Sequence, residues 1–236
     1  MPVDFKKCIG QSKIFYAFIK SGTIFSVVVS KPDLMPEIHY LVPKQTDGLE
    51  KDLTHSIAPD SVEIADDRFV DAKERLLDVN NWNRYSALTG ITFLLADGHG
   101  LHLKRRARKN DHIRLSLPSS VPGIPGSYDW AKIEAIEYDD YPDLNMETFA
   151  LRLRPCIEPK SGNEQTVSEF TYHGATATIV IERRGRMIFA TYHGRYELSP
   201  VHATLDGTNG QAIDVPSDGL GLTDDEYLAL IKGFIG

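Results

Sequence analysis

The sequence has little cysteine and no long uninterrupted apolar run. Its two cysteines, Cys8 and Cys156, are far apart and fit no metal-ligand spacing. The simple interpretation is a reduced, cytoplasmic setting, and one long-range disulfide stays open as an alternative. The most apolar stretch, Ile14–Val29, is interrupted by Lys20-Ser21-Gly22, which argues against a membrane span. No apolar segment follows Met1 closely enough for a signal peptide, so we expect none.

The common catalytic motifs are also missing. The chain has no Gly-x-Ser-x-Gly, no P-loop and no Gly-x-Gly-x-x-Gly, and neither cysteine has a base nearby in the sequence. His99 and His102 lack a third ligand at a plausible spacing, so we expect no metal site and no cofactor. The net charge of −7 argues against a sequence-independent nucleic-acid binder, which would normally be basic.

The composition is that of an ordinary globular protein: 236 residues, of which 42% are apolar and 25% charged. Lys13–Ile19 and Thr23–Ser30 predict a β-hairpin. Pro36–Pro59 is polar and contains three prolines, so we predict a linker or lid there. The expected organisation is an N-terminal hairpin extension with its linker (1–59) and a main domain (60–236), with a single domain as the alternative.

The main domain is expected to be built around one amphipathic helix. Asp66 or Asp67 is predicted to cap it, because a carboxylate accepts the free N–H groups of a first helical turn. The spacing places five side chains on one face: Phe69, Val70, Lys73, Leu76 and Leu77. The segment from Asp78 to Tyr85, with three asparagines around two large rings, is predicted to end the helix.

Short strands follow at the intervals of an antiparallel sheet. They are predicted at Ile91–Ala96, Leu101–Arg105, His112–Leu117, Ala131–Glu137, Phe149–Leu153, Ala177–Glu182 and Met187–Tyr192. A final helix, Asp224–Phe234, is predicted with Thr223 as its cap. No β-α-β alternation occurs. The predicted fold is α+β, with a strongly curved, mostly antiparallel β-sheet, barrel-like or split into two packed sheets, and one internal and one C-terminal short helix.

Candidate site residues gather around the last predicted hairpin. Thr-Tyr-His-Gly occurs twice, so that His173 and His193 lie at the two open ends. A two-residue loop at Arg184-Gly185 would put these histidines on opposite faces of the sheet, whereas a loop with an odd number of residues would put them on one face, where they could share a metal or a phosphate. His193, Arg195 and Glu197 fall on one side of a strand. Such a row could bind an anion and move a proton, or form a solvated edge.

A basic run is the second candidate surface. Lys104, Arg105, Arg106, Arg108 and Lys109 would attract phosphates or an acidic partner surface, or form a solvated hairpin tip. Rings that could supply stacking or partner contacts are Tyr128, Trp130 and Trp82. Because the whole chain is acidic, a protein partner is favoured over DNA.

Several segments resemble known proteins. Val79-Asn80-Asn81-Trp82, Tyr128-Asp129-Trp130 and His193-Gly194-Arg195-Tyr196-Glu197 are similar to an uncharacterised bacterial family of hypothetical proteins, over about Ser61 to the C-terminus. The helix followed by Asp78–Tyr85 resembles the helix-to-aromatic corner of START-like (polyketide cyclase) ligand-binding proteins. That second resemblance implies an apolar cavity between a curved sheet and a C-terminal helix.

The sequence leaves three alternative functions, of which the first is favoured. The first is a non-catalytic binding or assembly protein that engages a macromolecular partner through polar sheet rims and an Arg-rich hairpin. The second is a START-like carrier or sensor of a small apolar ligand, with a cavity lined by Phe69, Leu76, Phe93, Phe149, Ile179 and Phe189. The third is an enzyme that uses His193, Arg195 and Glu197, together with His173 or Asp129. The sequence leaves the oligomeric state open.

Overall fold

The computed structural model describes residues 6–10, 13–20, 23–30, 40–45, 48–118, 128–156, 158–159, 175–197 and 221–236. The chain divides into two units, Met1–His39 and Tyr40–Gly236. The first unit contains an antiparallel sheet of three strands in the order β1 (Lys6–Gly10), β2 (Lys13–Lys20) and β3 (Thr23–Ser30). The predicted hairpin is confirmed by the β2–β3 pairing. Strand β1 was not predicted, because its five residues include two lysines and a glycine and show no alternation.

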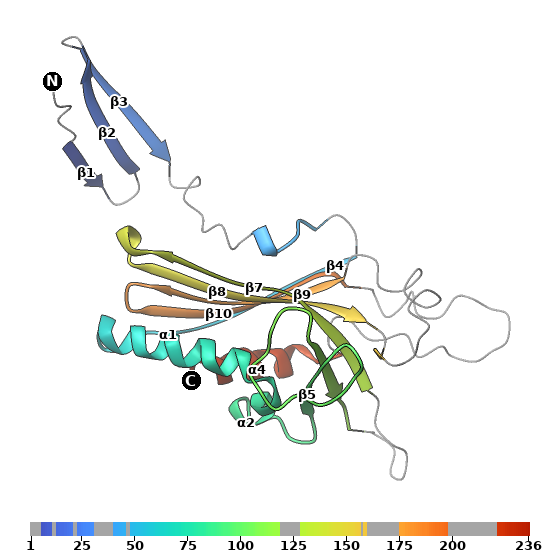
Figure 1. Cartoon of the computed structure of the whole chain (residues 1–236). Helices are drawn as coiled ribbons and strands as arrows, with labels where there is room; N and C mark the ends of the chain where they lie inside the picture. The colour runs from blue at the N-terminus through green and yellow to red at the C-terminus, as the bar shows by residue number, and fades with distance from the viewer. Residues whose placement is uncertain are drawn as a thin grey trace. The chain divides into compact units, whose positions relative to one another are not determined.

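The second unit is an open antiparallel sheet of seven strands in the order β4-β10-β9-β8-β7-β6-β5 (Figure 1). This confirms the α+β class, and the sheet does not close into a barrel. The other sheet of the chain, β1–β3, belongs to the first unit. The strands of the main sheet are β4 (Leu49–Ile57), β5 (Thr92–Ala96), β6 (His112–Ser116), β7 (Tyr128–Tyr141), β8 (Met146–Cys156), β9 (Thr176–Arg184) and β10 (Met187–Glu197).

Helices cover one face of this sheet. They are α1 (Val62–Leu77), the four-residue α2 (Trp82–Tyr85) and α4 (Asp224–Ile235), with short 3-10 turns η3 (Val79–Asn81) and η4 (Pro142–Leu144). Both long helices contribute buried residues to the same core as the sheet, and Figure 1 shows them beside each other under the strands. Within the described ranges, no helix is both long and apolar enough to cross a membrane.

Strand β4 corrects the predicted linker. Leu49–Ile57 is a nine-residue strand that pairs along β10, so this part of Pro36–Pro59 belongs to the main sheet. Its exposed residues alternate with half-buried ones, as in any half-covered strand. The alternation is hard to see in the sequence because two of the half-buried positions are Lys51 and His55. The ammonium group of Lys51 lies over the ring of Tyr227 and pairs with Asp224 at 2.9 Å, which explains how a charged residue faces the helices.

Helix α1 begins earlier than predicted. Its cap is Ser61, whose hydroxyl accepts a hydrogen bond from the Ile64 N–H at 3.2 Å, so the prediction of an Asp66 or Asp67 cap is wrong. The buried face of α1 consists of Ala65, Phe69, Ala72 and Leu76, whereas Val70 is exposed. The helix ends at Asp78 as predicted. The buried face therefore includes two alanines, Ala65 and Ala72, which the sequence pattern did not single out because their side chains are small.

The aromatic corner is the centre of the core. Trp82 is fully buried, and its ring meets Phe93 of β5 and Phe234 of α4 edge-on at centroid distances of 5.2 and 5.5 Å. Gly233 allows α4 to come close, because a Cβ at this position would lie 2.5 Å from the carbonyl atoms of Tyr85. Trp82 is therefore a packing residue, and its prediction as a partner contact is wrong.

Five of the six predicted cavity residues are buried in this one core: Phe69, Leu76, Phe93, Phe149 and Ile179. The sixth, Phe189, alternates with the core residues Ile188 and Ala190, so it lies on the other face of the sheet. There the guanidinium of Arg184 covers its ring at 5.9 Å. The six side chains therefore do not line one space.

The two edges of the main sheet are built differently. At the β5 edge, the Leu95 N–H donates to the Asn80 side-chain oxygen at 2.9 Å, and the Leu103 N–H donates to the Leu95 carbonyl at 2.8 Å. Residues 101–105 make only one isolated bridge, Ala96 to His102, so the strand predicted at Leu101–Arg105 is wrong. At the β4 edge, β10 is the one neighbouring strand among the described strands.

Candidate functional site

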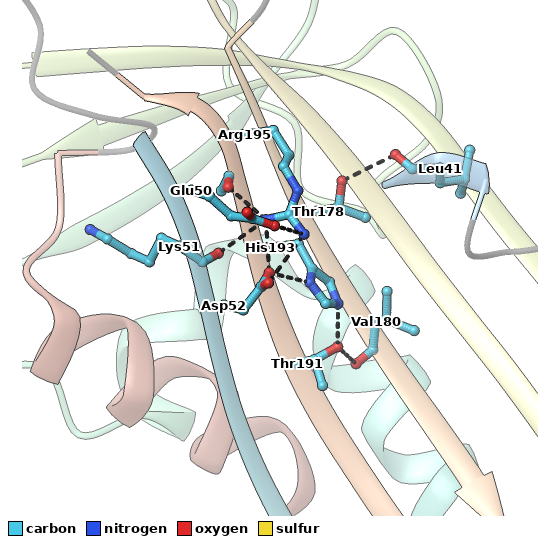
Figure 2. A network of polar contacts seen from close by, with 10 residues as sticks. Leu41, Glu50, Lys51, Asp52, Thr178, Val180, Thr191, His193 and Arg195 are labelled. Atoms are coloured by element: carbon cyan, nitrogen blue, oxygen red, sulfur yellow. Dashed lines mark hydrogen bonds and ion pairs between the residues drawn. The ribbon is translucent and has the colours of Figure 1, made fainter. Parts of the chain in front are cut away.

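Polar side chains gather where β10 runs beside β4, the last strand of the main sheet among the described strands. The register places His193 opposite Asp52, so both side chains leave the same face. His193 Nδ1 lies 2.6 Å from Asp52 Oδ1, and its Nε2 lies 3.1 Å from the Thr191 hydroxyl oxygen (Figure 2). The ring is thus held at both nitrogens. We call the group formed by Glu50, Asp52, Thr191, His193 and Arg195 the rim cluster.

Arg195 ties this cluster together. Its Nη1 donates to Asp52 Oδ1 at 2.8 Å, its Nη2 donates to Asp52 Oδ2 at 3.2 Å, and Nη2 also pairs with Glu50 at 3.1 Å. Nη1 further donates to the Gly194 carbonyl at 2.8 Å. The two-point contact with Asp52 fixes both partners, because a guanidinium matches the geometry of a carboxylate. The structure therefore brings together His193 and Arg195, which were predicted as site residues. The side chain of Glu197 and the whole of His173 lie outside the described residues.

Within the rim cluster the acidic side chains are more exposed than the basic ones. The side chains of Glu50 and Asp52 are 51% and 47% exposed, whereas those of Arg195 and His193 are 8% and 17% exposed. Partial burial raises the pKa of the Asp52 carboxyl, but hydrogen bonds from Arg195 and His193 outweigh it and hold that pKa below its ordinary value. The edge of the sheet consequently presents ionised carboxylates outward, with cations behind them.

The chemistry open to the rim cluster is limited by the same contacts. A hydroxyl, an imidazole and a carboxylate in a row is the arrangement that activates nucleophiles. Here Arg195 binds both oxygens of Asp52. The carboxylate is thus already neutralised by a guanidinium, which weakens its ability to stabilise a positive charge on His193. This favours a binding role over catalysis.

The Arg-rich hairpin is paired within the chain. Arg183 is buried and bonds Glu147 at 2.7 Å, Asp66 at 2.9 Å and the Asn145 side chain at 2.8 Å. Arg184 pairs with Glu182. The Arg183 guanidinium thus links β9 to β8 and α1, whereas Arg184 pairs within β9 and stays about half exposed.

The hairpin turn itself is Gly185-Arg186, one residue later than the predicted loop, because Arg184 faces Met187. Gly185 has φ +57°, a left-handed conformation that suits glycine in a two-residue turn. His193 therefore faces Thr178 of β9.

The basic run lies in the loop after β5. Arg105 makes a two-point contact with Asp111, at 2.6 and 2.8 Å, and Arg106 pairs with Glu74 at 3.0 Å and Asp78 at 2.7 Å. Within the described part of the chain, the exposed side chains of Lys104, Arg108 and Lys109 make no hydrogen bond or ion pair. Two of the five cations are therefore held by carboxylates, and three face solvent.

Of the two rings predicted to stack, one is exposed and the other is buried. Tyr128 is exposed and carries the Arg114 guanidinium at 5.0 Å from its ring, whereas Trp130 is buried. The expectation that Trp130 is an exposed platform is wrong, because its side chain is buried although Tyr128 and Lys132, on the same side of β7, are exposed. Tyr128 remains at the surface.

An open cleft of about 520 Å³ adjoins the basic run. It is lined by Asp78, Asn80, Asn81, His102, Lys104, Arg105 and Arg106. Asn80 links its two sides, since its amide nitrogen donates to the Leu103 carbonyl at 2.8 Å and its oxygen lies 3.2 Å from His102 Nε2. We call this the corner cleft.

Sequence reasoning missed Glu50, Asp52 and Asp78 as site residues. The signal for the first two was the alternation of Glu50, Asp52, Thr54 and Ser56, which a two-residue period could have revealed. Across the described ranges, no group of three or more potential ligands is placed to hold a metal ion. Searches against protein-family models and against curated proteins find no match for this sequence, so its function is argued from these side chains alone.

Proposed function

We propose that this chain is a non-catalytic binding protein, and that a partner protein adds an extended segment to the open edge of β4. The observation that carries the proposal is the combination of a nine-residue edge strand with the rim cluster beside it. An edge strand presents backbone N–H and C=O groups that pair with another extended chain. Such pairing supplies affinity, and the neighbouring side chains supply specificity.

The charge of the rim cluster indicates the chemistry of the partner. Glu50 and Asp52 leave the same side of β4 and are its most exposed charges on that side, while Arg195 is buried behind them. A segment with lysine or arginine at alternate positions would place both cations against these carboxylates, since strand side chains repeat every two residues. The favoured partner segment is therefore extended and basic.

The experiment compares two synthetic ten-residue peptides, one alternating lysine with threonine and one alternating glutamate with threonine. Fluorescence anisotropy measures their binding to the full chain. We expect the lysine peptide to bind and the glutamate peptide not to bind. Glu50→Lys should weaken binding of the lysine peptide by about tenfold, because it replaces an attraction with a repulsion.

Asp71→Lys is the matched control. Asp71 is an exposed acid on α1, and its reversal changes the net charge of the chain by the same amount. It should leave peptide binding within about twofold of the unchanged chain. Equal losses in the two variants would mean that net charge alone attracts the peptide, and the proposal would then fail.

A second candidate is a carrier of a small apolar ligand, as the START-like resemblance implies. The observation that favours it is the covering of one sheet face by α1 and α4 (Figure 1). The edge-on packing of Trp82 against Phe93 and Phe234 opposes it, since these rings occupy the space between β5 and α4. Titration with a fluorescent fatty acid tests it. Saturable binding that changes the tryptophan emission of a Trp130→Phe chain, in which Trp82 is the remaining tryptophan, would support a carrier, and an unchanged spectrum would remove it.

A further inference from the structure

The corner cleft has the features of a preformed anion site. One side is the turn after α1, with Asp78, Asn80 and Asn81, and the other is the loop that contains His102 and residues 104–106. Its volume of about 520 Å³ lies in the range of small-molecule sites, roughly 300–1,000 Å³. The cleft is separate from the rim cluster and shares no residue with it.

The cations of the cleft keep unused donors. Arg106 donates through Nε to Glu74 and pairs through Nη1 with Asp78, so the contacts of the described residues leave its Nη2 unused. Arg105 donates through Nη1 to Asp111 and to the Arg106 carbonyl and through Nη2 to Asp111. Within the contacts of the described residues, its Nε donates to no acceptor. A guanidinium has five N–H donors, so each can take a further acceptor while it remains fixed. Lys104 adds an exposed ammonium group.

The fixed positions of these donors matter for binding. The carboxylates of Asp111, Glu74 and Asp78 hold the two guanidiniums before any ligand arrives. A ligand would therefore immobilise Lys104 but not the two arginines, which lowers the entropic cost of binding. Phosphate suits such a site because its oxygens accept hydrogen bonds from several donors at once.

Asp78 supplies a hydrogen-bond acceptor to the cleft. Its Oδ2 takes the Asn81 amide at 3.0 Å, the Tyr85 hydroxyl at 2.7 Å and the Arg106 guanidinium at 2.7 Å. In the described contacts its Oδ1 takes none. Partial burial raises the pKa of Asp78, and these hydrogen bonds outweigh it and lower the pKa below its ordinary value. An ionised oxygen is thus available to accept from a hydroxyl group.

We propose that the corner cleft binds a small phosphorylated molecule that also carries hydroxyl groups. Lys104, Arg105 and Arg106 contact the phosphate, and Asp78 accepts a hydrogen bond from a hydroxyl group of the ligand. His102 also lines the cleft; its Nε2 lies 3.2 Å from Asn80 Oδ1, and among the contacts of the described residues its Nδ1 has no partner.

Isothermal titration calorimetry with the full chain tests the assignment, with ribose 5-phosphate, inorganic phosphate and ribose as probes. Ribose 5-phosphate should bind at least about tenfold more tightly than inorganic phosphate, and ribose alone should give no signal. Lys104→Gln should weaken ribose 5-phosphate by about tenfold. Lys109→Gln is the matched control, because this lysine is exposed in the same loop but does not line the cleft.

The hydroxyl contact has its own variant. Asp78→Asn should reduce the advantage of ribose 5-phosphate over inorganic phosphate without abolishing the binding of either, with circular dichroism confirming the fold. Equal affinities for the two phosphates in the unchanged chain would overturn the hydroxyl contact. No binding of either phosphate, or equal losses in the two lysine variants, would overturn the site. Glu50→Lys, at the rim cluster, should leave all these affinities unchanged.

Discussion

The two edges of the main sheet differ in what pairs with them within the described part of the chain: side-chain and loop groups bond to β5, whereas β4 has a neighbouring strand on one side only. The β5 edge is covered by the Asn80 side chain and the Leu103 backbone, which pair with Leu95 on both its N–H and its carbonyl. The β4 edge has charged side chains and, among the described strands, a neighbour on one side only. An uncovered edge is a liability unless it has a use, because it can pair with any extended chain.

The comparison also links edge closure to cleft formation. Asn80 both occupies the Leu95 N–H and lines the corner cleft. The loop that shields β5 is the loop that carries the basic run. At this end of the sheet, protection against aggregation and construction of a polar cleft are achieved by the same residues.

The largest effect on the closed edge should come from Trp82→Ala. It removes a fully buried ring that supports the corner from which Asn80 projects, and such truncations cost about 3–5 kcal/mol of unfolding free energy. Urea unfolding followed by circular dichroism measures the loss. Tyr128→Ala is the control, because that ring is exposed. A loss for Trp82→Ala no greater than that of the control would contradict the packing described.

A smaller effect is expected from Asn80→Ala. The Leu95 N–H would lose its acceptor, which costs about 1–3 kcal/mol when the group is shielded from water. Hydrogen exchange at the Leu95 amide should accelerate in step with the loss of stability. Asn83→Ala is the matched control, because the structure records no side-chain hydrogen bond for Asn83 among the described residues. Unchanged exchange at Leu95 would show that the edge is closed by the loop alone.

The open edge should be affected less by Arg195→Met. This change keeps most of the side-chain volume but leaves Asp52 and Glu50 without their guanidinium. Since both carboxylates are about half exposed, we expect a loss of about 1–2 kcal/mol rather than the larger cost of a fully buried pair. Thermal unfolding measures it. The lysine peptide should still bind the variant, because the acidic surface is retained.

The smallest effect is a pH dependence at Asp52. Its pKa is lowered in the folded chain, so its contribution to stability is complete above the unfolded value near 3.8 and is lost as pH falls through the folded value. Asp52→Asn should therefore lower stability by under about 1 kcal/mol at neutral pH. The two chains should converge as pH drops below 3.8. A difference that stays constant with pH would contradict the role of the charge.

Sequence patterns predicted the elements whose chemistry is local. The end of α1 at Asp78 follows from its asparagines, and the helix α4 follows from Thr223 and Glu226, which form a capping box. The hairpins β2–β3 and β9–β10 follow from alternation and glycine turns. These features depend on residues within one or two turns of each other.

The rest depends on long-range pairing that no local pattern encodes. Asp52 and His193 are 141 positions apart, and only the β4–β10 register brings them together. The inward-facing Lys51 concealed β4, because its position is explained only by the Tyr227 ring and Asp224 on a distant helix. Trp82 and Trp130 were predicted as surface rings for the same reason, since burial is decided by which elements come to cover them.

The pairing of β4 with β10 also has a consequence for synthesis. The ribosome delivers β4 early and its partner about 140 residues later, and at 5–20 residues per second that interval is roughly 7–30 seconds. For that time β4 lacks β10, the strand with which it pairs, and its lysine, carboxylates and histidine make it polar. The polar residues that make β4 difficult to predict from the sequence thus also suit a strand that is synthesised long before its partner.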